Sequence, residues 1–484
     1  MQRAVDGSRP TRRRFLTGMA AASATLALQG CASARARRVL GANEALRLGV
    51  VGLNGRGSEL VGSFRRLPGV RIAALCDVDR AVLDRATVAA AGRGDQVVAF
   101  TDYRRLLDSG SVDAVVIATP NHWHALMGVM ACEAGLDAYV EKPVSHDVWE
   151  GAQLAAAAER HGRVVACGTQ CRSHSGPAEA IAFARSGQLG AMKLVRGLCY
   201  KRRGSIGRVR AAQPVPATVD SDLWFGPAPL APVMRSRFHY DWHWQWPYGN
   251  GDLGNQGVHQ MDLCRMAIGA EELPRTVLGI GGRVGYEDDG ETPNTQLVWA
   301  DYAPVPIVFE VRGLPERAGS DGLDAHLGAQ IGLTIHCEHG TVVIHSYTAG
   351  FALDREGKRI REFKGGGDHY ANFTAAVRAG DAKLLSADAR TGHLSAALCH
   401  LGNESVRRGR SAGLAEIAER VAGTPALAES LERMRAHLQA NGIGAIGLER
   451  ADTIVLGAVA DPDDDETLWQ PRAYRAPFVL EEQA

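Results

Sequence analysis

Residues 46–57 read LRLGVVGLNGRG, a short apolar run that ends in a cluster of glycines. An apolar run rich in β-branched residues is typical of a strand that is buried on both faces of a parallel sheet. Residues 58–64 then read as the start of a helix. A strand, a tight glycine turn and a helix N-terminus together form a phosphate site, because the backbone approaches the ligand closely and free N–H groups face it.

The glycines match the dinucleotide fingerprint G-x-G-x-x-G only in part. Gly52 and Gly57 take its first and last positions, whereas Asn54 stands at the middle one, with Gly55 beside it. Asn tolerates a left-handed backbone better than most residues, so the turn can still form. Glycine turns also occur in plain βα packing. We nevertheless predict a dinucleotide site, with Gly52, Asn54, Gly55, Arg56 and Gly57 at the cofactor.

An acidic residue stands where the ribose of the adenosine is expected. The apolar run of residues 70–75 leads to Asp77, about 20 residues after Gly57. An acid at that distance accepts hydrogen bonds from the ribose and favours NAD over NADP. Asp79 is close enough to take the same role, and Arg80 would weaken the preference. We therefore expect NAD as the cofactor, with NADP as the less favoured alternative.

The whole chain has 484 residues, 45% of them hydrophobic and 22% charged, and its formal net charge is zero. This length and composition predict a globular protein with two or more domains. A neutral chain gives no sign of binding nucleic acid, and no apolar run reaches the roughly 20 residues that cross a bilayer. We therefore expect no nucleic-acid partner and no transmembrane span.

The N-terminus reads as an export signal. Residues 11–16, TRRRFL, fit the twin-arginine pattern and precede a small-residue apolar segment, so we expect residues 1–34 to be a signal peptide. Residues 28–31, LQGC, resemble a lipobox that would attach a lipid to Cys31, whereas residues 32–34, ASA, offer an ordinary cleavage site. The alternative is a basic disordered tail. The expected location is periplasmic, or anchored on the outer side of the membrane.

Apolar runs alternate with helical patterns over residues 45–168, which predicts a doubly wound parallel sheet with ligands at the carboxyl ends of its strands. Two polar motifs fall at such ends. Residues 119–124 read TPNHWH after the strand at 112–118, and residues 141–143 read EKP after the strand at 137–140. Both motifs are therefore expected at one edge of the sheet.

The motifs VVGLNGRG, CDVD, ATPNHWH, VEKP and GNQGVHQMD, in this order, resemble those of the Gfo/Idh/MocA family. The resemblance covers residues 46–410. It implies an α/β Rossmann domain with a doubly wound parallel sheet, residues 45–168, followed by an α+β domain, residues 169–410. In the second domain an open, mostly antiparallel sheet would face the nicotinamide and often also builds the oligomer interface. We therefore expect a homo-oligomer.

Residues 411–484 lie beyond the resemblance. They read as a helical appendage over residues 415–441, a strand-like stretch at 453–457 and an acidic turn at 461–466. No function follows from this pattern.

The resemblance implies that Lys142 and His259 form the catalytic acid–base pair. A lysine that is partly desolvated beside a cationic nicotinamide has a lowered pKa and can polarise or deprotonate a carbinol. A neutral imidazole suits a general base that takes the hydroxyl proton. A surface lysine and a helix-capping histidine are the structural alternatives. Glu141 is expected to shape the turn, and both Glu141 and Lys142 are counted among the residues that bind the cofactor.

One position departs from the family pattern. Four residues before the histidine many members carry an aspartate, whereas this chain has Asn255. An amide can hold a substrate hydroxyl but cannot take a proton, so a relay from Asp to His is lost or moved. Asp252 and Asp262 are the two candidates to substitute for it.

Residues 238–248 read FHYDWHWQWPY, in a chain with only 6% aromatic residues. Aromatic faces beside Asn, Asp and His bind sugar rings through stacking and directed hydrogen bonds, so we predict that Trp242 and His243 contact a carbohydrate substrate. A buried core strand or an oligomer contact explains the aromatic residues equally well. His239 and His243 lack a third ligand at a usable spacing, so we expect no metal.

Two sets of residues complete the predicted site. The TPNHWH motif adds four residues to the cofactor set, namely Thr119, Pro120, Asn121 and His124. The resemblance adds four residues to the substrate set, namely Arg172, Tyr200, Asn255 and His259, and it also places Lys201, next to Tyr200, among the positions that line the cleft.

The sequence therefore predicts an NAD(P)-dependent oxidoreductase that transfers hydride between nicotinamide and a hydroxyl carbon of a sugar or sugar-like substrate. Twin-arginine export moves folded proteins, and free NAD is scarce outside the cytoplasm, which favours a tightly bound cofactor. A trapped cofactor would also suit a redox-neutral glycoside hydrolase or lyase that acts through a transient keto-sugar, as in some exported relatives. The EKP motif looks more like the dehydrogenase branch. A non-catalytic sensor of cofactor or sugar is the third possibility.

Overall fold

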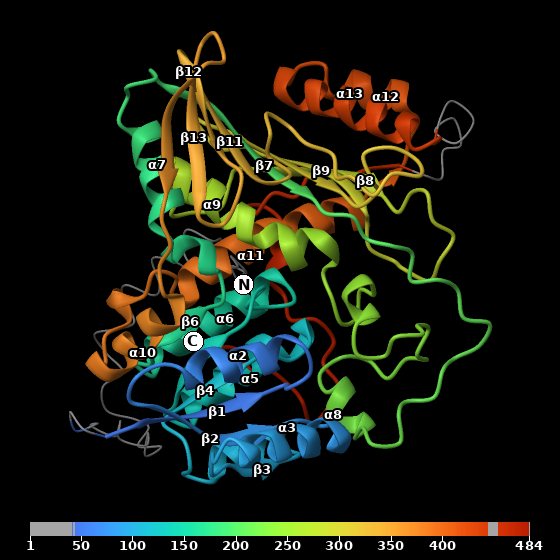
Figure 1. Ribbon diagram of the computed structural model, residues 1–484. Helices are drawn as coiled ribbons and strands as arrows, with labels where there is room; N and C mark the ends of the chain where they lie inside the picture. Colours follow the sequence, from blue (N-terminus) through green and yellow to red (C-terminus); the bar gives the residue numbers. More distant parts are fainter. Residues whose placement is uncertain (1–40, 42–43, 444–453, 484) are drawn as a thin grey trace, which may run out of the picture.

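The computed structural model describes residues 41, 44–443 and 454–483. The predicted signal peptide, with its lipobox cysteine Cys31, lies outside the described residues. Figure 1 shows two layers of structure, a Rossmann domain in the lower half and a second domain built on a large sheet in the upper half. The predicted fold class is confirmed in both halves.

The first domain contains a six-stranded sheet in the order β3-β2-β1-β4-β5-β6, and every pairing within it is parallel. Its strands are β1 (Leu46–Val51), β2 (Val70–Cys76), β3 (Val98–Phe100), β4 (Ala114–Ile117), β5 (Asp137–Val140) and β6 (Val165–Cys167). Its helices are α2 (Arg56–Arg65), α3 (Arg80–Gly92), α4 (Tyr103–Asp108), α5 (Asn121–Glu133) and α6 (Val148–Arg160). The strand order reverses between β1 and β4, and such a switch point is where open α/β sheets bind ligands.

The second domain contains a ten-stranded sheet in the order β14-β13-β12-β11-β7-β10-β9-β8-β16-β15, antiparallel except where β7 pairs with β10. Its first strands are β7 (Met192–Tyr200), β8 (Val277–Gly282), β9 (Thr295–Ala300), β10 (Ile307–Arg312) and β11 (Ile331–Cys337). The others are β12 (Gly340–Ile344), β13 (Ala349–Asp354), β14 (Arg359–Lys364), β15 (Arg410–Ser411) and β16 (Val455–Leu456). Three helices lie between this sheet and the Rossmann domain, namely α7 (Ser175–Arg185), α9 (Val258–Ile268) and α11 (Ala389–Arg407).

Two late helices pack on the first domain although they fall within the predicted second domain, residues 169–410. Phe373 of α10 (His369–Ala379) is fully buried among Leu46 of β1 and Leu60 of α2. Ala389 and Ala396 of α11 join the apolar cluster on the other face of the Rossmann sheet. The chain thus returns to the first domain after it has built most of the second.

The C-terminal residues divide into three parts. The helix predicted over residues 415–441 is interrupted, because Gly423 and Pro425 separate α12 (Leu414–Val421) from α13 (Pro425–Ala440). Both helices lie on the outer face of the sheet, at the upper right of Figure 1. Within the predicted strand, Thr453 lies outside the described residues, and β16 pairs with β8.

The last part of the chain runs back to the Rossmann domain. After a short 3₁₀ turn (Glu466–Trp469), residues 470–483, which we call the C-terminal tail, descend beside α6 as the red trace in Figure 1. Phe478 and Leu480 of this tail are 5% and 3% exposed and belong to the same apolar cluster as Trp123 of α5. The C-terminus therefore completes the core of the first domain.

A long connection between β7 and α9 also spans both domains. Residues 201–250, which we call the crossing segment, carry the short helix α8 (Ser221–Phe225) and form the green loop on the right of Figure 1. The Arg80 amide donates to the carbonyl oxygen of Thr218 at 2.9 Å, and the Asp220 amide donates to that of Val78 at 2.9 Å. These bonds hold the crossing segment against the loop that follows β2.

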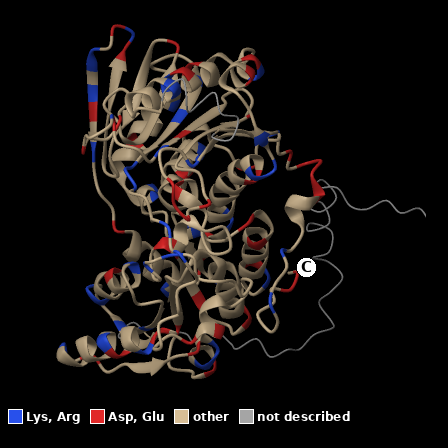
Figure 2. Ribbon diagram, turned by 90° about the vertical axis from the view of Figure 1, so that its right-hand side faces the viewer, with Lys and Arg blue, Asp and Glu red and all other residues tan. Residues whose placement is uncertain are grey.

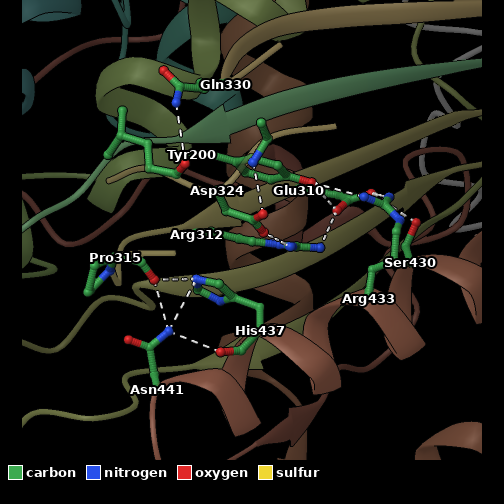
Figure 3. A network of polar contacts seen from close by, with 12 residues as sticks. Tyr200, Glu310, Arg312, Pro315, Asp324, Gln330, Ser430, Arg433, His437 and Asn441 are labelled. Atoms are coloured by element: carbon green, nitrogen blue, oxygen red, sulfur yellow. Dashed lines mark hydrogen bonds and ion pairs between the residues drawn. The ribbon is translucent and has the colours of Figure 1, made fainter. Parts of the chain in front are cut away.

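A buried ionic network joins α13 to the outer face of the sheet (Figure 3). Glu310 of β10 is fully buried and forms ion pairs with Arg196 of β7 at 2.8 Å and with Arg312 at 3.0 Å. Arg433 of α13 completes the set with a third ion pair. Burial works against the charge of Glu310, but the three arginines prevail and lower its pKa to about 2. The network therefore fixes α13 on the sheet.

The charged side chains of the molecule are mixed in sign. Figure 2 shows Lys and Arg interspersed with Asp and Glu over both domains. None of the helices within the described ranges combines the length and apolarity that crossing a bilayer would need.

Candidate active site

The glycine turn after β1 has the close approach that a pyrophosphate needs. Gly52 and Gly55 have φ angles of 78° and 65°, so the left-handed positions of the turn fall on glycines. Asn54 does not take such a position, although its place in the fingerprint had indicated one. A Cβ atom on Gly57 would overlap the carbonyl oxygen of Gly52, whereas a Cβ on Gly55 would meet nothing within 4 Å. The turn is thus tight inside and open toward a ligand, which fits a dinucleotide.

Asp77 and not Asp79 is available for the ribose. The carboxylate of Asp77 accepts from the Leu53 amide at 2.7 Å and from the Asp79 amide at 2.9 Å, and the side chain lines a cavity. Asp79 is 4% exposed, caps α3 and forms an ion pair with His239 at 2.9 Å. Since each oxygen of Asp77 retains a free lone pair, Asp77 remains the candidate that distinguishes NAD from NADP.

The cavity runs from the glycine turn along α5 and has a volume of about 380 Å³. Its lining includes three predicted cofactor residues besides Asp77 and Gly52, namely Asn54, Thr119 and Pro120. The apolar part of the lining comes from α4, α5 and the C-terminal tail, with Tyr103, Trp123, Met127, Phe478 and Leu480. A mostly apolar cleft with a few polar groups, at the switch point of the sheet, fits the adenosine half of NAD.

Two of the predicted cofactor residues, His124 and Asn121, are buried and bind other parts of the protein around the site. His124 is 1% exposed, and its two ring nitrogens face the carbonyl oxygens of Pro143 at 2.6 Å and Thr119 at 2.7 Å. Asn121 is 4% exposed and donates to the side-chain oxygen of Asn250 at 2.9 Å. His124 therefore braces the two polar motifs against each other, and Asn121 holds the crossing segment. The expectation of direct cofactor contact by these two side chains is corrected accordingly.

Arg56 and Glu141 form a pair at the start of α2. Arg56 Nε lies 2.8 Å from a carboxylate oxygen of Glu141, which is 3% exposed, and a second guanidinium nitrogen donates to the Tyr370 hydroxyl at 2.9 Å. Although burial opposes the charge of Glu141, the cations Arg56 and Lys142 keep its pKa below the usual value. The pair orients the EKP turn, so Glu141 acts on the position of Lys142 rather than on the cofactor.

Lys142 joins the two domains at the site. Its Nζ donates to the carbonyl oxygen of Asn255 at 2.8 Å and to the Asn255 side-chain oxygen at 3.3 Å. Burial lowers the pKa of Lys142, and the charges of Arg56 and Lys201 lower it further, against the opposing effect of Glu141. The Lys142–Pro143 peptide bond is cis. A lysine with a lowered pKa has the property that a general base requires.

Asn255 lies on a π-helical turn, Leu253–Gly257, that leads directly into α9. Such turns displace one residue from the regular helical hydrogen-bond pattern and often mark functional sites. The turn presents the carbonyl oxygen of Asn255 to Lys142. It also precedes His259, which occupies the first turn of α9.

His259 is 5% exposed, and its Nδ1 has no hydrogen-bond partner although the atom is buried. Burial lowers the pKa of His259 well below its usual value, and the nearby charge of Lys142 adds to this effect. Its ring lies 5.4 Å from that of Tyr347, measured between centroids. A neutral imidazole beside Lys142, with an unsatisfied nitrogen, can exchange a proton with a bound hydroxyl.

The two carboxylates considered as substitutes for an aspartate at position 255 are already paired. Asp252 lies 2.9 Å from Arg203, and Asp262 lies 2.8 Å from Arg172. Neither is free to relay a proton to His259. Arg172 meets both oxygens of Asp262, so its guanidinium holds α9, and its assignment to the substrate set stays a prediction.

Tyr200 lies outside the site, contrary to the prediction. Its hydroxyl donates to Glu310 at 2.6 Å within the network under α13 (Figure 3), on the opposite face of the sheet. The next residue, Lys201, faces the site instead and donates from Nζ to the side-chain oxygen of Gln256 at 3.0 Å. Gln256 in turn donates to the Tyr347 hydroxyl at 2.8 Å. Of the Tyr200–Lys201 pair that the resemblance placed at the cleft, Lys201 is therefore the residue at the site, whereas the sequence alone did not identify Gln256 or Tyr347 as site residues.

The aromatic stretch of the crossing segment contributes to both ends of the cleft. Trp242 lines the cavity beside Asp77, and its ring stacks on His243 with centroids 3.7 Å apart and planes 18° apart. His243 Nδ1 bonds to the carbonyl oxygen of Tyr240 at 2.6 Å, which makes Nδ1 the protonated nitrogen. Burial lowers the pKa of His243 to about 3, and the nearby charge of Lys142 contributes. Among the described residues no metal-binding group of three or more ligands occurs.

Two family models match the chain. The model described as "Oxidoreductase family, NAD-binding Rossmann fold" matches residues 46–169. The model described as "Oxidoreductase family, C-terminal alpha/beta domain" matches residues 193–281. The first match covers the glycine turn, Asp77 and Lys142, and confirms the prediction of an NAD-binding Rossmann domain.

Curated relatives match over the first part of the chain. The glycosyl hydrolase family 109 protein of Shewanella sp. strain W3-18-1 is 38% identical over 122 residues, 24% of this chain and 27% of that protein. The glycosyl hydrolase family 109 protein 2 of Shewanella sp. strain ANA-3 is 35% identical over 172 residues, 31% of this chain and 38% of that protein. The chain thus spans about a quarter to two fifths of the length of these relatives.

Solved structures share the fold at low identity. The WlbA dehydrogenase from Bordetella pertussis, crystallised with NADH and UDP-GlcNAcA, aligns with a TM-score of 0.55 and 18% identity over 75% of this chain and 97% of that one. An oxidoreductase from Thermotoga maritima aligns with a TM-score of 0.55 and 17% identity over 75% and 97% of the two chains. These alignments show that the two-domain architecture is common to all three proteins.

Proposed function

This chain belongs to the Gfo/Idh/MocA family of oxidoreductases, and from that premise we propose that it interconverts a hydroxyl and a carbonyl group on a sugar or sugar-like substrate. Bound NAD would exchange the hydride, so the residues of the chain have to position the substrate and handle the proton. The contact between Lys142 Nζ and Asn255 carries this proposal. It places a lysine with a lowered pKa at the junction of the cofactor domain and the second domain.

The residues around this contact have different roles in the proposed reaction. Lys142, whose pKa is lowered by burial, takes the proton of the substrate hydroxyl at Nζ, and the carbonyl oxygen of Asn255 then accepts a hydrogen bond from the ammonium group. His259, whose pKa is lowered by burial and by the nearby Lys142, offers a second proton acceptor. The side-chain amide of Asn255 is left to hold a neighbouring hydroxyl, because it cannot take a proton itself.

The experiment that tests the acid–base assignment compares two lysine variants. Lys142→Ala is expected to lower turnover of sugar-dependent NAD reduction by about 10²–10⁴-fold, the usual contribution of a positioned acid or base. Binding of NAD, followed by titration calorimetry, should stay within a factor of three, because the phosphates meet the turn at Gly52. Lys358→Ala, in the exposed hairpin between β13 and β14, is the matched control. Undiminished turnover in Lys142→Ala would refute the proposal.

A second candidate is a redox-neutral glycosidase. The family 109 glycosyl hydrolases among the relatives favour it. Asp252 and Asp262 are each paired with an arginine, so these two carboxylates are not available as the acid and nucleophile of ordinary glycoside hydrolysis. In such a reaction a hydroxyl is oxidised, the aglycone is eliminated from the activated ketone, water adds, and the carbonyl is reduced again. The cofactor then ends each turnover in its starting state.

The two candidates differ in what they consume and release. The mature protein should be purified without added cofactor, denatured, and its supernatant assayed for NAD and NADH. If stoichiometric NAD is carried through, aryl glycosides should be cleaved in D₂O, and deuterium should appear at the carbon next to the transient ketone. If the protein is empty and reduces added NAD with a free sugar, the dehydrogenase is the correct assignment.

We also propose export by the twin-arginine route. The signal at residues 11–16 supports this, with Arg12 and Arg13 as its arginine pair. In cell fractionation, Arg12→Lys/Arg13→Lys should keep the protein in the cytoplasm, whereas the wild-type chain should be found outside it. Cytoplasmic wild-type protein would argue against export.

A further inference from the structure

The outer wall of the adenosine cavity comes from the end of the chain. Residues 477–481 line the same cavity as Gly52 and Asp77. Phe478 is the residue of this stretch that is fixed most firmly, because its ring meets Trp123 of α5 edge-on at 5.4 Å between centroids. The guanidinium groups of Arg475 and Arg104 lie 4.9 Å and 5.5 Å from the same ring. The wall is therefore an ordered part of the cavity.

The tail is attached to the Rossmann domain by a buried ion pair. Arg472 lies 2.7 Å from a carboxylate oxygen of Glu150, a residue of α6 that is 1% exposed. The same arginine donates to the carbonyl oxygen of His122 at 3.0 Å, and the Tyr474 hydroxyl donates to Glu150 at 3.0 Å. Removing Arg472 from this site would leave the Glu150 carboxylate buried without its cation, which opposes detachment.

A second attachment joins the tail to the crossing segment. Arg475 forms an ion pair with Asp222 of α8 and donates from Nε to the carbonyl oxygen of Gly226 at 3.0 Å. The crossing segment is itself held to the Rossmann domain by the ion pair of His239 with Asp79. The tail and the crossing segment therefore cover the cavity together and support each other.

We propose that the C-terminal tail is part of the NAD site: residues 477–481 bind the adenosine half, and the anchored tail keeps the dinucleotide from leaving. This inference deepens the proposed function and rests on it in taking NAD as the ligand. An adenosine enclosed between α5 and Phe478 can leave only after the tail moves, and that movement breaks the contacts of Arg472 and Arg475. Release should therefore be slow, and it should be limited by the tail.

The experiment measures release of the cofactor and needs no turnover. The full-length protein is loaded with ¹⁴C-labelled NAD and chased with excess unlabelled NAD, and the label that stays bound is followed by rapid filtration. Phe478→Ala, which removes the ring from the cavity wall, is expected to release the label at least tenfold faster than the wild type. Leu468→Ala is the matched control, because Leu468 lies just before the tail and is buried in the second domain, away from the cavity. It should release the label at the wild-type rate.

A second pair of variants tests the same idea without disturbing the folded core. Val479 and Val459 are 48% and 47% exposed, so an aspartate at either position leaves the core intact. Only Val479 lines the cavity. Val479→Asp is expected to accelerate release, because it brings a negative charge toward an anionic ligand, while Val459→Asp should not.

The outcomes distinguish a failure of the proposed role of the tail from a failure of the proposed function. If the wild type binds NAD and both Phe478→Ala and Val479→Asp release it within twofold of the wild-type rate, the role of the tail is refuted and the proposed function stands. If wild-type protein that has first been freed of any cofactor it carries binds no labelled NAD at all, the proposed function fails and the inference fails with it. Faster release in the cavity variants alone supports the tail.

Discussion

Lys142 and Asn255 meet at the junction of the two domains, where Lys142 Nζ donates to the main-chain carbonyl oxygen of Asn255 at 2.8 Å. The lysine follows β5 of the Rossmann sheet, and the asparagine belongs to the π-helical turn before α9. Neither domain contains both partners. The geometry of the candidate active site therefore depends on how the domains are held together.

Replacing the asparagine by the acid that many family members carry should change the pH dependence. In Asn255→Asp a carboxylate would lie next to Lys142 Nζ, where the amide oxygen now lies at 3.3 Å, and would favour the charged lysine. The pKa of Lys142 should rise, so the acidic limb of the pH–rate profile should move to higher pH and activity near neutrality should fall by about tenfold. Asn255→Gln, which adds no charge, is the comparison. An unmoved acidic limb in Asn255→Asp would mean that Lys142 is not the titrating base.

Asp77→Ala should weaken the binding of NAD and improve the relative use of NADP. The variant removes the carboxylate that lines the cavity and is proposed to bind the ribose, and loss of such a hydrogen bond costs about 1–3 kcal/mol. The ratio of the dissociation constants for NAD and NADP, measured by calorimetry, should shift by at least tenfold toward NADP. Asp79→Asn should keep the cap of α3, weaken the contact with His239 and leave that ratio unchanged. If Asp79→Asn alters the ratio instead, Asp79 is the residue that binds the ribose.

Arg172→Ala should reduce stability rather than substrate affinity. The variant leaves the fully buried carboxylate of Asp262 without its cation, a change that typically costs about 3–5 kcal/mol. We expect a clear drop in the midpoint of urea unfolding, with the Michaelis constant for the sugar within a factor of two. Lys201→Ala should show the reverse, because Lys201 bonds to Gln256 at the site. A large rise in the Michaelis constant of Arg172→Ala would place it in the substrate set.

Glu310→Gln tests the network beneath α13. The pKa of Glu310 is lowered from 4.5 to about 2, so its charge stabilises the folded state above about pH 4.5, and that contribution is lost as the pH falls toward 2. Near pH 7 the variant should be destabilised by about 3–5 kcal/mol, because three arginines lose their shared counter-charge. In urea unfolding the difference from wild type should shrink between pH 4.5 and 2. Glu429→Gln, at a half-exposed ion pair with Arg196, should cost less than about 1 kcal/mol.

The Rossmann half of the site could be predicted because its determinants are local. The apolar run of β1 and the glycines at 52, 55 and 57 lie within one short stretch, and Asp77 follows at the spacing that a βαβ unit imposes. Lys142 and His259 came from motifs that the family shares. The sequence could not show which residue forms an ion pair with each charged side chain. Nothing local indicates that Arg172 is paired with Asp262.

Tyr200 shows a second limit of sequence. Successive residues of a strand point to opposite faces, so an error of one position exchanges the site for the far side of the sheet. Tyr200 ends β7 with its hydroxyl on Glu310, and Lys201 follows it on the side of Gln256. The tail is a third case. Arg472 contacts His146 across a sequence separation of 326 residues, and no periodicity can reveal such a contact.

The position of the tail also sets an order on biosynthesis. The glycine turn and Asp77 leave the ribosome long before Phe478 and Leu480, which complete the same cavity. All the residues between them must be translated before the adenosine cavity has all of its walls. The finished cavity therefore forms only after the C-terminal tail has been made, so a nascent chain that stops short of the tail cannot enclose a dinucleotide in the same way.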